Sequence, residues 1–337
     1  MIKVGLIGAG KMGISHLAIL GAHPDVEISG VCDTSKMVLD VLEKYSSFKC
    51  YTDYRKMISE RRPDAVVVAV PTKMHAAMVR ELLEQGIHVF VEKPFCLHPS
   101  EAEPLITLAK QKNLVNQVGY HNKWVGTFAE VKRLLSRNAI GEIYHFHGQA
   151  YGPVVVKQKQ DTWRSSPDEG GGCLMDYASH VIDLINYLIS PVQSVPSSML
   201  KSVFSRSVED AVFAMLKLSN GVSGVLSVNW SDETYRKMTT SVQINGRKGK
   251  IVSDANELKV FFNDGECPQG YSKGWNVKYV TDLTPQVDFY LRGEEYTAQM
   301  DHFISAVKGD AGTGINTFES ASHTDRAIDL IRKAQFS

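Results

Sequence analysis

The sequence is poor in cysteine and has no excess of charge of either sign. Its five cysteines are scattered over 337 residues without a C-x-x-C pair, which indicates free thiols in a reducing cytoplasm rather than a disulfide framework. Lysine and arginine together number 37, as do aspartate and glutamate, so the formal net charge is +0. A general nucleic-acid-binding protein has a basic excess, so nucleic acid is not expected as a partner.

Long apolar runs, internal repeats and low-complexity segments are also missing. No run approaches the roughly 20 apolar residues of a membrane span, so no membrane partner is expected. The chain enters a strand pattern at once, which leaves no room for a signal peptide and predicts a cytoplasmic location. A hydrophobic fraction of 43% and a charged fraction of 22% are typical of a globular protein, and the length suggests about two domains.

A glycine motif lies between the first expected strand and the first expected helix. Residues 3–8 are short, apolar and β-branched, residues 14–23 have helical spacing, and residues 26–33 predict a second strand. The connecting segment, IGAGKMG, has G-x-G-x-x-G spacing. In this order of elements the motif predicts a dinucleotide site; the alternative is a structural turn that happens to carry three glycines.

Each residue of the motif has a physical role. Gly8 permits the tight turn, Gly10 lets the backbone approach a pyrophosphate, and Gly13 lets the helix pack against the strand. The N–H groups at the helix start would hold the phosphates. Asp33 ends the second strand and would bind a ribose 2′-hydroxyl, which predicts NAD; NADP is the alternative because Lys36 lies close by.

Strand and helix patterns alternate through about residue 120. Further strands are expected at residues 48–53, 64–70, 88–94 and 114–120. Helices are expected at residues 34–46, 54–60, 71–86 and 100–113, the last with Ser100 as its N-cap. This alternation predicts an α/β Rossmann domain, a doubly wound parallel sheet with helices on both faces, over residues 1–121.

Residues 122–337 are expected to form a second, α+β domain for substrate binding and oligomerisation. Two Asn-Gly turns predict hairpins, one joining 210–218 to 222–230 and one joining 239–244 to 248–254. These patterns indicate a large, mostly antiparallel sheet with helices on one face. A strand at 143–151 and helices at 127–136, 294–309 and 317–335 complete the expected elements.

Residues 210–218 predict a homo-oligomer. Both alternating faces of this strand carry apolar side chains, and a sheet covered by helices on one side would expose the other. A partner subunit is the simplest cover for that face, so we expect a homodimer or homotetramer.

The segment VEKPF, residues 91–95, follows the fifth expected strand. Ligands bind beyond the carboxyl ends of the strands in open α/β sheets, so Glu92 and Lys93 are expected at the cofactor crevice. Pro94 fixes the backbone and is able to form a cis peptide bond, which would aim the lysine ammonium in a defined direction.

A second segment with candidate catalytic residues is GGGCLMDYASHVIDLINYL, residues 170–188. Asp176, His180 and Asp183 have the spacing of one helix face. Histidine suits proton transfer near neutral pH, and a neighbouring carboxylate can orient it. One alternative is a solvated polar face, which the apolar character of this helix disfavours. The other is a metal site, but no cysteine pair or third histidine has ligand spacing, so no metal is expected.

Taken together, these motifs resemble the Gfo/Idh/MocA family of nicotinamide-dependent oxidoreductases of sugars, inositols and related polyols. The resemblance rests on the glycine loop, on E-K-P after the fifth strand and on D-x-x-x-H after a triple glycine, and it covers essentially the whole chain. PTKMH at 71–75 resembles the loop after the family's fourth strand, and NGRKGKI at 245–251 resembles a turn in its second-domain sheet.

The resemblance implies roles for these residues. Lys93 would polarise the reacting hydroxyl or carbonyl oxygen, His180 would be the general acid/base, and Asp176 would contact the substrate or orient the histidine. Glu92 and Pro94 would shape the loop under the nicotinamide. The expected cofactor-binding residues are Gly8, Gly10, Lys11, Met12, Gly13, Asp33, Pro71, Thr72, His75, Glu92 and Lys93.

The expected substrate site departs from the family pattern in one loop. Many relatives have an arginine-aromatic-x-proline run where this chain has Lys123-Trp124 and Gly126. The segment Thr162-Trp163-Arg164 offers a flat apolar face and a guanidinium, which would suit a sugar ring and an anionic group, although a structural Trp with a surface Arg is an equal alternative. The expected substrate-binding residues are Lys93, Tyr120, Asn122, Lys123, Trp163, Arg164, Asp176 and His180.

The sequence therefore predicts an NAD(P)-dependent dehydrogenase or reductase. It would transfer a hydride between the nicotinamide and a secondary alcohol or ketone of a sugar, nucleotide-linked sugar or cyclitol. One alternative is a non-catalytic dinucleotide-binding regulator of the same fold, which would not need both Lys93 and His180. Another is a reductase of a non-sugar substrate such as a dihydrodiol or bilin, which the histidine of D-x-x-x-H disfavours.

Overall fold

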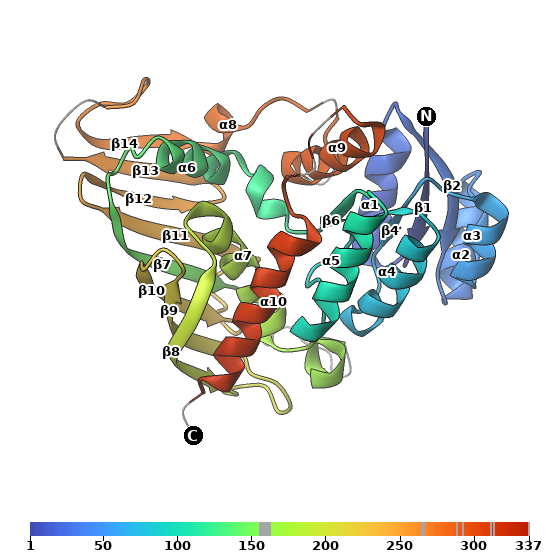
Figure 1. Ribbon diagram of the computed structural model, residues 1–337, viewed down its shortest axis with the longest axis horizontal. Helices are drawn as coiled ribbons and strands as arrows, with labels where there is room; N and C mark the ends of the chain where they lie inside the picture. The colour runs from blue at the N-terminus through green and yellow to red at the C-terminus, as the bar shows by residue number, and fades with distance from the viewer. Residues whose placement is uncertain are drawn as a thin grey trace. The chain divides into compact units, whose positions relative to one another are not determined.

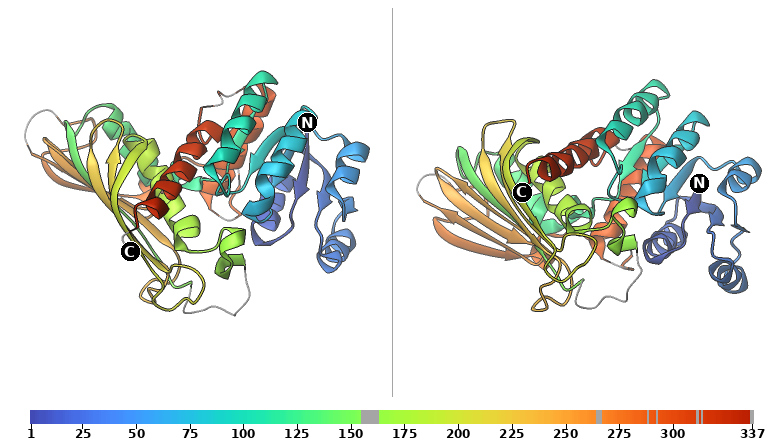
Figure 2. Two further views of the ribbon diagram at one scale, coloured as in Figure 1. Left: turned by 60° about the horizontal axis from the view of Figure 1, so that its bottom comes forward. Right: turned by 90° about the horizontal axis from the view of Figure 1, so that it is seen from below.

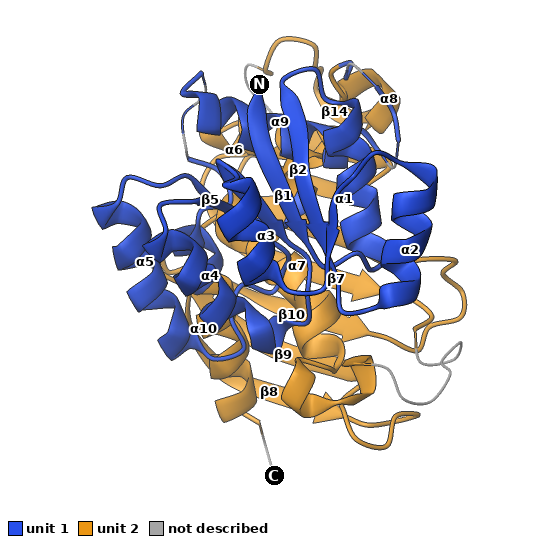
Figure 3. Ribbon diagram, turned by 90° about the vertical axis from the view of Figure 1, so that its right-hand side faces the viewer, with its two compact units in different colours: residues 1–121, 286–322 blue, residues 122–285, 323–337 orange. Residues whose placement is uncertain are grey.

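A computed structural model describes residues 1–154, 163–263, 267–287, 289–291, 293–310, 312 and 314–335 of the chain. Figure 3 shows two compact units, the first comprising residues 1–121 and 286–322 and the second residues 122–285 and 323–337. The first unit thus includes a segment that lies far along the chain. The domain division 1–121 and 122–337 stays a prediction.

The first unit contains a six-stranded sheet in the order β3-β2-β1-β4-β5-β6. Every pairing in it is parallel, as expected for a doubly wound fold, and β4 is buried along its whole length. The strands are β1 (Ile2–Ile7), β2 (Val26–Cys32), β3 (Cys50–Tyr51), β4 (Ala65–Val68), β5 (His88–Val91) and β6 (Asn116–Val118). The predicted parallel Rossmann sheet is confirmed.

Helices lie on both faces of this sheet (Figure 1). An apolar cluster packs on each face. One cluster includes Leu82 and Leu105, and the other includes Leu20 and Phe303. The helices of the unit are α1 (Lys11–Ala22), α2 (Lys36–Tyr45), α3 (Tyr54–Arg61), α4 (His75–Glu84), α5 (Ala102–Gln111) and α9 (Glu294–Lys308). Burial on both faces is why the strands are continuous apolar runs rather than alternating ones.

The predicted N-cap of α5 is wrong. Ser100 lies within a 3₁₀ turn, η2 (Pro99–Glu101), and α5 begins only at Ala102. Pro99 starts the turn early, and the Glu101 carboxylate reaches back to accept a hydrogen bond from the His98 N–H at 2.9 Å. Proline at the first position of a turn loses no backbone hydrogen bond there, which explains the earlier start.

The second unit contains an eight-stranded sheet in the order β14-β13-β12-β11-β7-β10-β9-β8. Its pairings are antiparallel except that between β7 and β10. The strands are β7 (Ile143–Tyr151), β8 (Val192–Lys201), β9 (Ala211–Leu218), β10 (Ser223–Asn229), β11 (Thr239–Gly246), β12 (Gly249–Asp254), β13 (Glu257–Phe262) and β14 (Gly274–Tyr279). Both predicted hairpins, β9–β10 and β11–β12, are confirmed.

Helices of the second unit pack on one face of this sheet, as predicted (Figure 2). They are α6 (Gly126–Ser136), α7 (Ser179–Leu188), the short α8 (Val280–Leu283) and α10 (Phe318–Lys333), of which residues 323–333 belong to this unit. On the opposite face Phe213 is 43% exposed and Met215 is 56% exposed. Within the described ranges of the chain, no helix is both long and apolar enough to cross a membrane.

Candidate active site

The glycine loop between β1 and α1 is built so tightly that two of its glycines are obligatory. Gly8 has a φ of +94°, and a Cβ there would lie 2.4 Å from the Ala69 carbonyl oxygen. A Cβ on Gly13 would lie 1.8 Å from the Gly8 oxygen. A Cβ on Gly10, by contrast, would meet nothing within 4 Å, so the backbone there faces open space. Close packing at two glycines and an open approach at the third fit a pyrophosphate site.

Asp33 lies beside this loop, as the sequence predicts. Its Oδ2 accepts a hydrogen bond from the Ala9 N–H at 2.6 Å, and its Oδ1 accepts one from the Ser35 N–H at 2.7 Å. The carboxylate therefore ties the glycine loop to the carboxyl end of β2. A carboxylate has about four acceptor positions, so two remain for a ribose diol.

The other predicted cofactor residues of this region begin two helices. Lys11 and Met12 are the first residues of α1, whose N-cap, Gly10, supplies no side-chain hydrogen bond to the helix N–H groups. Pro71 and Thr72 follow β4 and begin the 3₁₀ turn η1 (Thr72–Met74). An uncapped helix start can donate its free N–H groups to phosphate oxygens.

His75, at the start of α4, is fully buried and links two loops. Its Nδ1 lies 2.9 Å from the Pro94 oxygen and 3.2 Å from the Phe95 oxygen, while its Nε2 lies 2.9 Å from the Val70 oxygen. Burial lowers the pKa of this imidazole below its usual value, although the surrounding carbonyl groups oppose the shift. The side chain thus connects the segment after β4 to the one after β5. Its predicted contact with the cofactor stays a prediction.

Glu92 and Lys93 follow β5 directly, and the Lys93–Pro94 peptide bond is cis. The Glu92 Oε1 accepts a hydrogen bond from His16 Nε2 at 2.5 Å, and its Oε2 accepts one from the Lys93 N–H at 3.2 Å. Burial alone would raise the pKa of this carboxyl. The hydrogen bond from His16 and the charges of His16 and Lys93 outweigh that effect, so the pKa lies below its usual value.

Sequence reasoning missed His16. A signal was available, because His16 lies on the buried stripe of α1 with Gly13, Leu17 and Leu20. A polar side chain on such a stripe needs a hydrogen-bonding partner. The sequence could not indicate that the partner lies 76 residues away.

The triple glycine at 170–172 is required by backbone geometry. Gly170 and Gly172 have φ values of +84° and +98°, a region that favours glycine. A Cβ on Gly171 would lie 2.3 Å from the Arg164 oxygen. Beyond the turn, the Glu209 carboxylate accepts a hydrogen bond from the Leu174 N–H at 2.9 Å. The glycines therefore let the chain fold back closely on the segment around residue 164.

The following helix differs from the expected regular one. Residues Leu174–Ala178 form a π-helical turn, and α7 begins only at Ser179. Because four residues no longer make one helical turn at Asp176, the expectation that Asp176 and His180 share one face of a regular α-helix does not hold as stated. Such π turns occur frequently at functional sites. Asp176, His180 and Asp183 are only 5%, 4% and 1% exposed, so the alternative of a solvated polar face is excluded.

Arg164 and Asp176 form an ion pair in the second unit. The guanidinium Nε donates to Asp176 Oδ2 at 3.0 Å, and the Trp163 ring centre lies 4.6 Å from the guanidinium carbon. Three predicted substrate-site residues are thus brought together, with Arg164 and Trp163 partly exposed. Thr162 lies outside the described residues.

Lys123 is buried against α7. Its Nζ donates to Asp183 Oδ1 at 2.9 Å, and the two side chains are 3% and 1% exposed. Burial raises the pKa of Asp183 despite the opposing charge of Lys123. No sequence pattern indicates this pairing, and the predicted substrate contact of Lys123 stays a prediction.

Tyr120 and Asn122 are buried, at 0% and 4% exposed. The Tyr120 carbonyl oxygen accepts a hydrogen bond from Asn316 Nδ2 at 2.6 Å, within the first unit. Asn122 begins the second unit, and the Val125 N–H donates to its carbonyl oxygen. Their contacts with substrate stay predictions.

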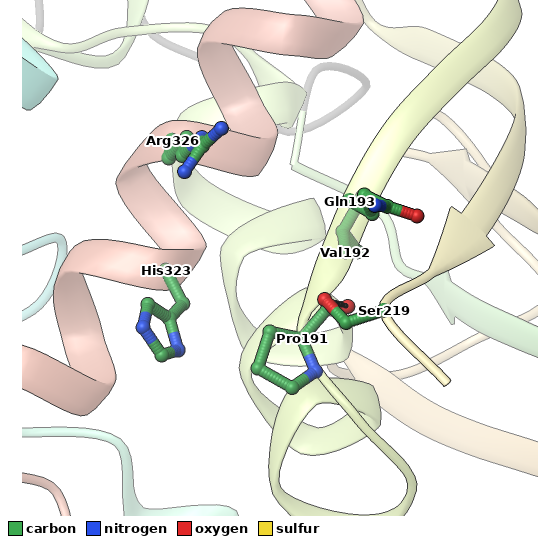
Figure 4. A pocket seen from close by; sticks show the side chains of 6 residues that line it. All are labelled: Pro191, Val192, Gln193, Ser219, His323 and Arg326. Atoms are coloured by element: carbon green, nitrogen blue, oxygen red, sulfur yellow. Dashed lines mark hydrogen bonds between the residues drawn. The ribbon is translucent and has the colours of Figure 1, made fainter. Parts of the chain in front are cut away.

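Two surface hollows lie apart from these residues. A cavity of about 370 Å³ in the second unit lies between α10 and the start of β8 (Figure 4), and one of about 600 Å³ in the first unit lies between α4 and α5. Neither is lined by a predicted site residue. Among the residues that the structure describes, no three His, Cys, Asp or Glu side chains are grouped as a metal ion would need.

Models of two protein-family domains match the chain. Residues 2–120 match the model of an oxidoreductase family with an NAD-binding Rossmann fold, GFO_IDH_MocA, and residues 128–252 match the GFO/IDH/MocA C-terminal domain. A levoglucosan dehydrogenase of Pseudarthrobacter phenanthrenivorans is 25% identical over 321 residues, covering 84% of this chain and 81% of the relative.

Solved structures share the whole fold. A levoglucosan dehydrogenase in complex with NADH and L-sorbose has a TM-score of 0.87 at 22% identity, over 99% of this chain and 96% of that one. The WlbA dehydrogenase from Bordetella pertussis, in complex with NADH and UDP-GlcNAcA, has a TM-score of 0.85 at 22% identity, over 99% and 95%. With both family models matched, the chain belongs to the Gfo/Idh/MocA family of NAD-dependent oxidoreductases.

Proposed function

We propose that this enzyme transfers a hydride between a nicotinamide and a secondary alcohol or ketone of a sugar, a nucleotide-linked sugar or a cyclitol. The observation that carries the proposal is the placement of Lys93 beside the ionised Glu92, after a strand of the sheet that also bears the glycine loop. That position presents an ammonium group at the cofactor end of the sheet.

The cofactor supplies or accepts the hydride when it is bound. The N–H groups at the start of α1 would hold its pyrophosphate beside Gly10, and Asp33 would accept hydrogen bonds from a ribose diol. Lys11, Met12, Pro71, Thr72 and His75 shape the remainder of the cofactor site.

The catalytic roles are assigned to Lys93, His180 and Asp176. The Lys93 ammonium polarises the reacting oxygen of the substrate, and His180 takes up or returns the hydroxyl proton. Asp176, fixed by its ion pair with Arg164, orients the histidine or binds a substrate hydroxyl. The chain's own residues thereby supply position and a proton path for chemistry that belongs to the cofactor.

Several features support a sugar-like substrate. Trp163 offers a flat ring and Arg164 a guanidinium beside Asp176, a combination that suits a sugar ring with hydroxyl or anionic substituents. Similar proteins act on levoglucosan or bind UDP-GlcNAcA. Tyr120, Asn122 and Lys123 are assigned to the same substrate site.

The second unit also supports association with a second copy of the chain. The sheet face opposite its helices exposes five large apolar side chains on β9 and β14 by 43–57%: Phe213, Met215, Trp275, Val277 and Tyr279. We assign this face to the interface of a homodimer or homotetramer, since such exposure is typical of protein–protein contacts. In this proposal residues 1–121 bind the dinucleotide, and residues 122–337 bind substrate and associate.

The expected location is the cytoplasm, with a small molecule and further copies of the chain as partners. All five cysteines are free, which suits a reducing compartment. The zero formal net charge gives no basis for binding nucleic acid.

The direct test is an activity screen. Purified protein is incubated with NAD⁺ or NADP⁺ and a panel of polyols, sugars and UDP-sugars, and reduction is followed by the nicotinamide absorbance; ketones are tested with the reduced cofactors. Turnover on a sugar or cyclitol, abolished in Lys93→Met, is the expected result. Cofactor binding without turnover on any panel member would favour a non-catalytic regulator, and turnover only on dihydrodiols or bilins would favour the non-sugar reductase.

A further inference from the structure

A buried hydrogen bond connects the dinucleotide-binding helix to the loop that carries Lys93. His16, in α1, is 0% exposed, and its Nε2 donates to Glu92 Oε1 at 2.5 Å. The other ring nitrogen, Nδ1, has no hydrogen-bonding partner among the described residues. We therefore assign a ring proton to Nε2, because a carboxylate can only accept a hydrogen bond.

The His16 ring is held in place by its surroundings. It meets the Phe90 ring edge-on at 5.2 Å between centroids, and Phe90 in turn meets Phe303 at 5.8 Å. An imidazole packed in this way has little rotational freedom. It therefore fixes the position of the carboxylate to which it donates.

The Glu92 carboxylate is enclosed on a further side by Gly119. A Cβ on Gly119 would lie 3.1 Å from the carboxyl carbon and from both of its oxygens, so the carboxylate lies directly against this glycine. Its remaining oxygen, Oε2, accepts from the Lys93 N–H at 3.2 Å. This chain of hydrogen bonds thus begins in α1, the helix whose first residues are assigned to the cofactor site. It ends at the backbone of Lys93, the residue assigned to polarise the substrate.

We propose that His16 is a positioning residue for Lys93, acting through Glu92. The His16 hydrogen bond keeps the Glu92 carboxylate in the orientation that accepts from the Lys93 N–H, and this fixes the backbone from which the lysine side chain projects. No residue role given by the resemblance includes His16. The inference rests on the proposed catalytic function of Lys93.

The experiment compares three variants. His16→Phe removes the donor and keeps a ring that can pack against Phe90, whereas His16→Gln keeps a donor. His23→Gln is the matched control, because His23 caps the other end of α1 and has its own carboxylate partner, Asp301. Each protein is measured for kcat, for the KM of NAD, for thermal unfolding and for hydrogen exchange of the Lys93 amide by mass spectrometry.

We expect His16→Phe to lower kcat roughly 10–100-fold, the range for losing a hydrogen bond to a charged group. The KM of NAD should change by less than about threefold, because the glycine loop is intact. The Lys93 amide should exchange faster without a general rise across α1 and β5. His16→Gln should restore most of kcat and of the amide protection, and His23→Gln should match the wild type in both.

Two results would overturn the inference. One is a wild-type kcat and wild-type Lys93 protection in His16→Phe; the other is an equal loss in His16→Phe and His16→Gln, which would indicate a packing role. If the wild type turns over no substrate, the proposed function fails, and the exchange measurement still decides the role of His16. If His16→Phe does not fold, Glu92→Gln removes the charged acceptor instead and is measured in the same way.

Discussion

The two sheets of this protein differ in how their apolar side chains are buried. In the first unit, β4 is buried at every position, because parallel strands are joined through helices that cover both faces of the sheet. In the second unit, β9 alternates between buried and exposed positions, with Val212 at 0% exposure next to Phe213 at 43%. Hairpin connections place helices on one face only.

This difference indicates which surface of each unit is open to a ligand or to another subunit. The first unit covers both faces of its sheet with its own apolar clusters, and the backbone at Gly10 faces open space. The second unit leaves large apolar side chains exposed on the opposite face of its sheet, among them Trp275 and Met215. We therefore expect substitutions in the first unit to affect the dinucleotide and substitutions on the open face of the second to affect association.

The largest effect on kcat is expected at His180, a buried residue of the second unit that is assigned to catalysis. His180→Ala should lower kcat by about 10²–10⁴-fold, the usual contribution of a general acid/base. NAD affinity should be nearly unchanged, because no contact with the dinucleotide is assigned to His180. His323→Ala, which removes an exposed histidine from α10, is the matched control.

A double variant sharpens this test. Combining His180→Ala with Lys93→Met should cost much less than the product of the two single losses, because the two groups are assigned to one catalytic step. If His180→Ala lowers the unfolding temperature but keeps kcat within a fewfold of wild type, His180 is only a packed helix residue and the mechanism is wrong.

Substitutions at two neighbouring residues of β9 test the roles of its covered face and its open face independently. Val212→Asp places a charge in the core and should destabilise the fold by several kcal/mol, on the order of the largest single-residue effects. Phe213→Asp, one residue further along, should leave the folded protomer intact and dissociate the oligomer. Circular dichroism melts and analytical ultracentrifugation distinguish the two; a monomeric wild type at micromolar concentration would contradict the assignment.

The glycine loop offers a similar contrast within the first unit. Gly13→Ala puts a Cβ 1.8 Å from the Gly8 oxygen, so it should cost about 1–3 kcal/mol of unfolding free energy or more. Gly10→Ala meets nothing within 4 Å and should fold normally, but should weaken NAD binding by about tenfold, since the methyl occupies the pyrophosphate approach. Equal NAD affinity in Gly10→Ala and wild type would place the pyrophosphate elsewhere.

Local pattern was enough to predict the strands of the first unit, β7, the two hairpins and the glycine loop, because each depends on residues close together in sequence; β8, β13 and β14 were not predicted. It was not enough for pairings across the fold. The His16–Glu92 bond spans 76 residues and the Lys123–Asp183 pair spans 60, so neither partner is indicated by the sequence around the other. The π turn at Leu174–Ala178 was also missed, because the apolar spacing of this segment indicated a regular helix.

The smallest expected effect concerns cofactor choice at Asp33. Its carboxylate already accepts two backbone hydrogen bonds, from Ala9 and Ser35, so Asp33→Ser removes both a charge and part of the loop's support. Losing the charge that repels a 2′-phosphate should shift the NADP:NAD preference toward NADP by about tenfold. Asp40→Ser removes the same charge from an exposed position of α2 and should leave the preference unchanged. Isothermal titration with both cofactors gives the ratio directly, and a wild type that binds NADP more tightly than NAD would refute the role assigned to Asp33.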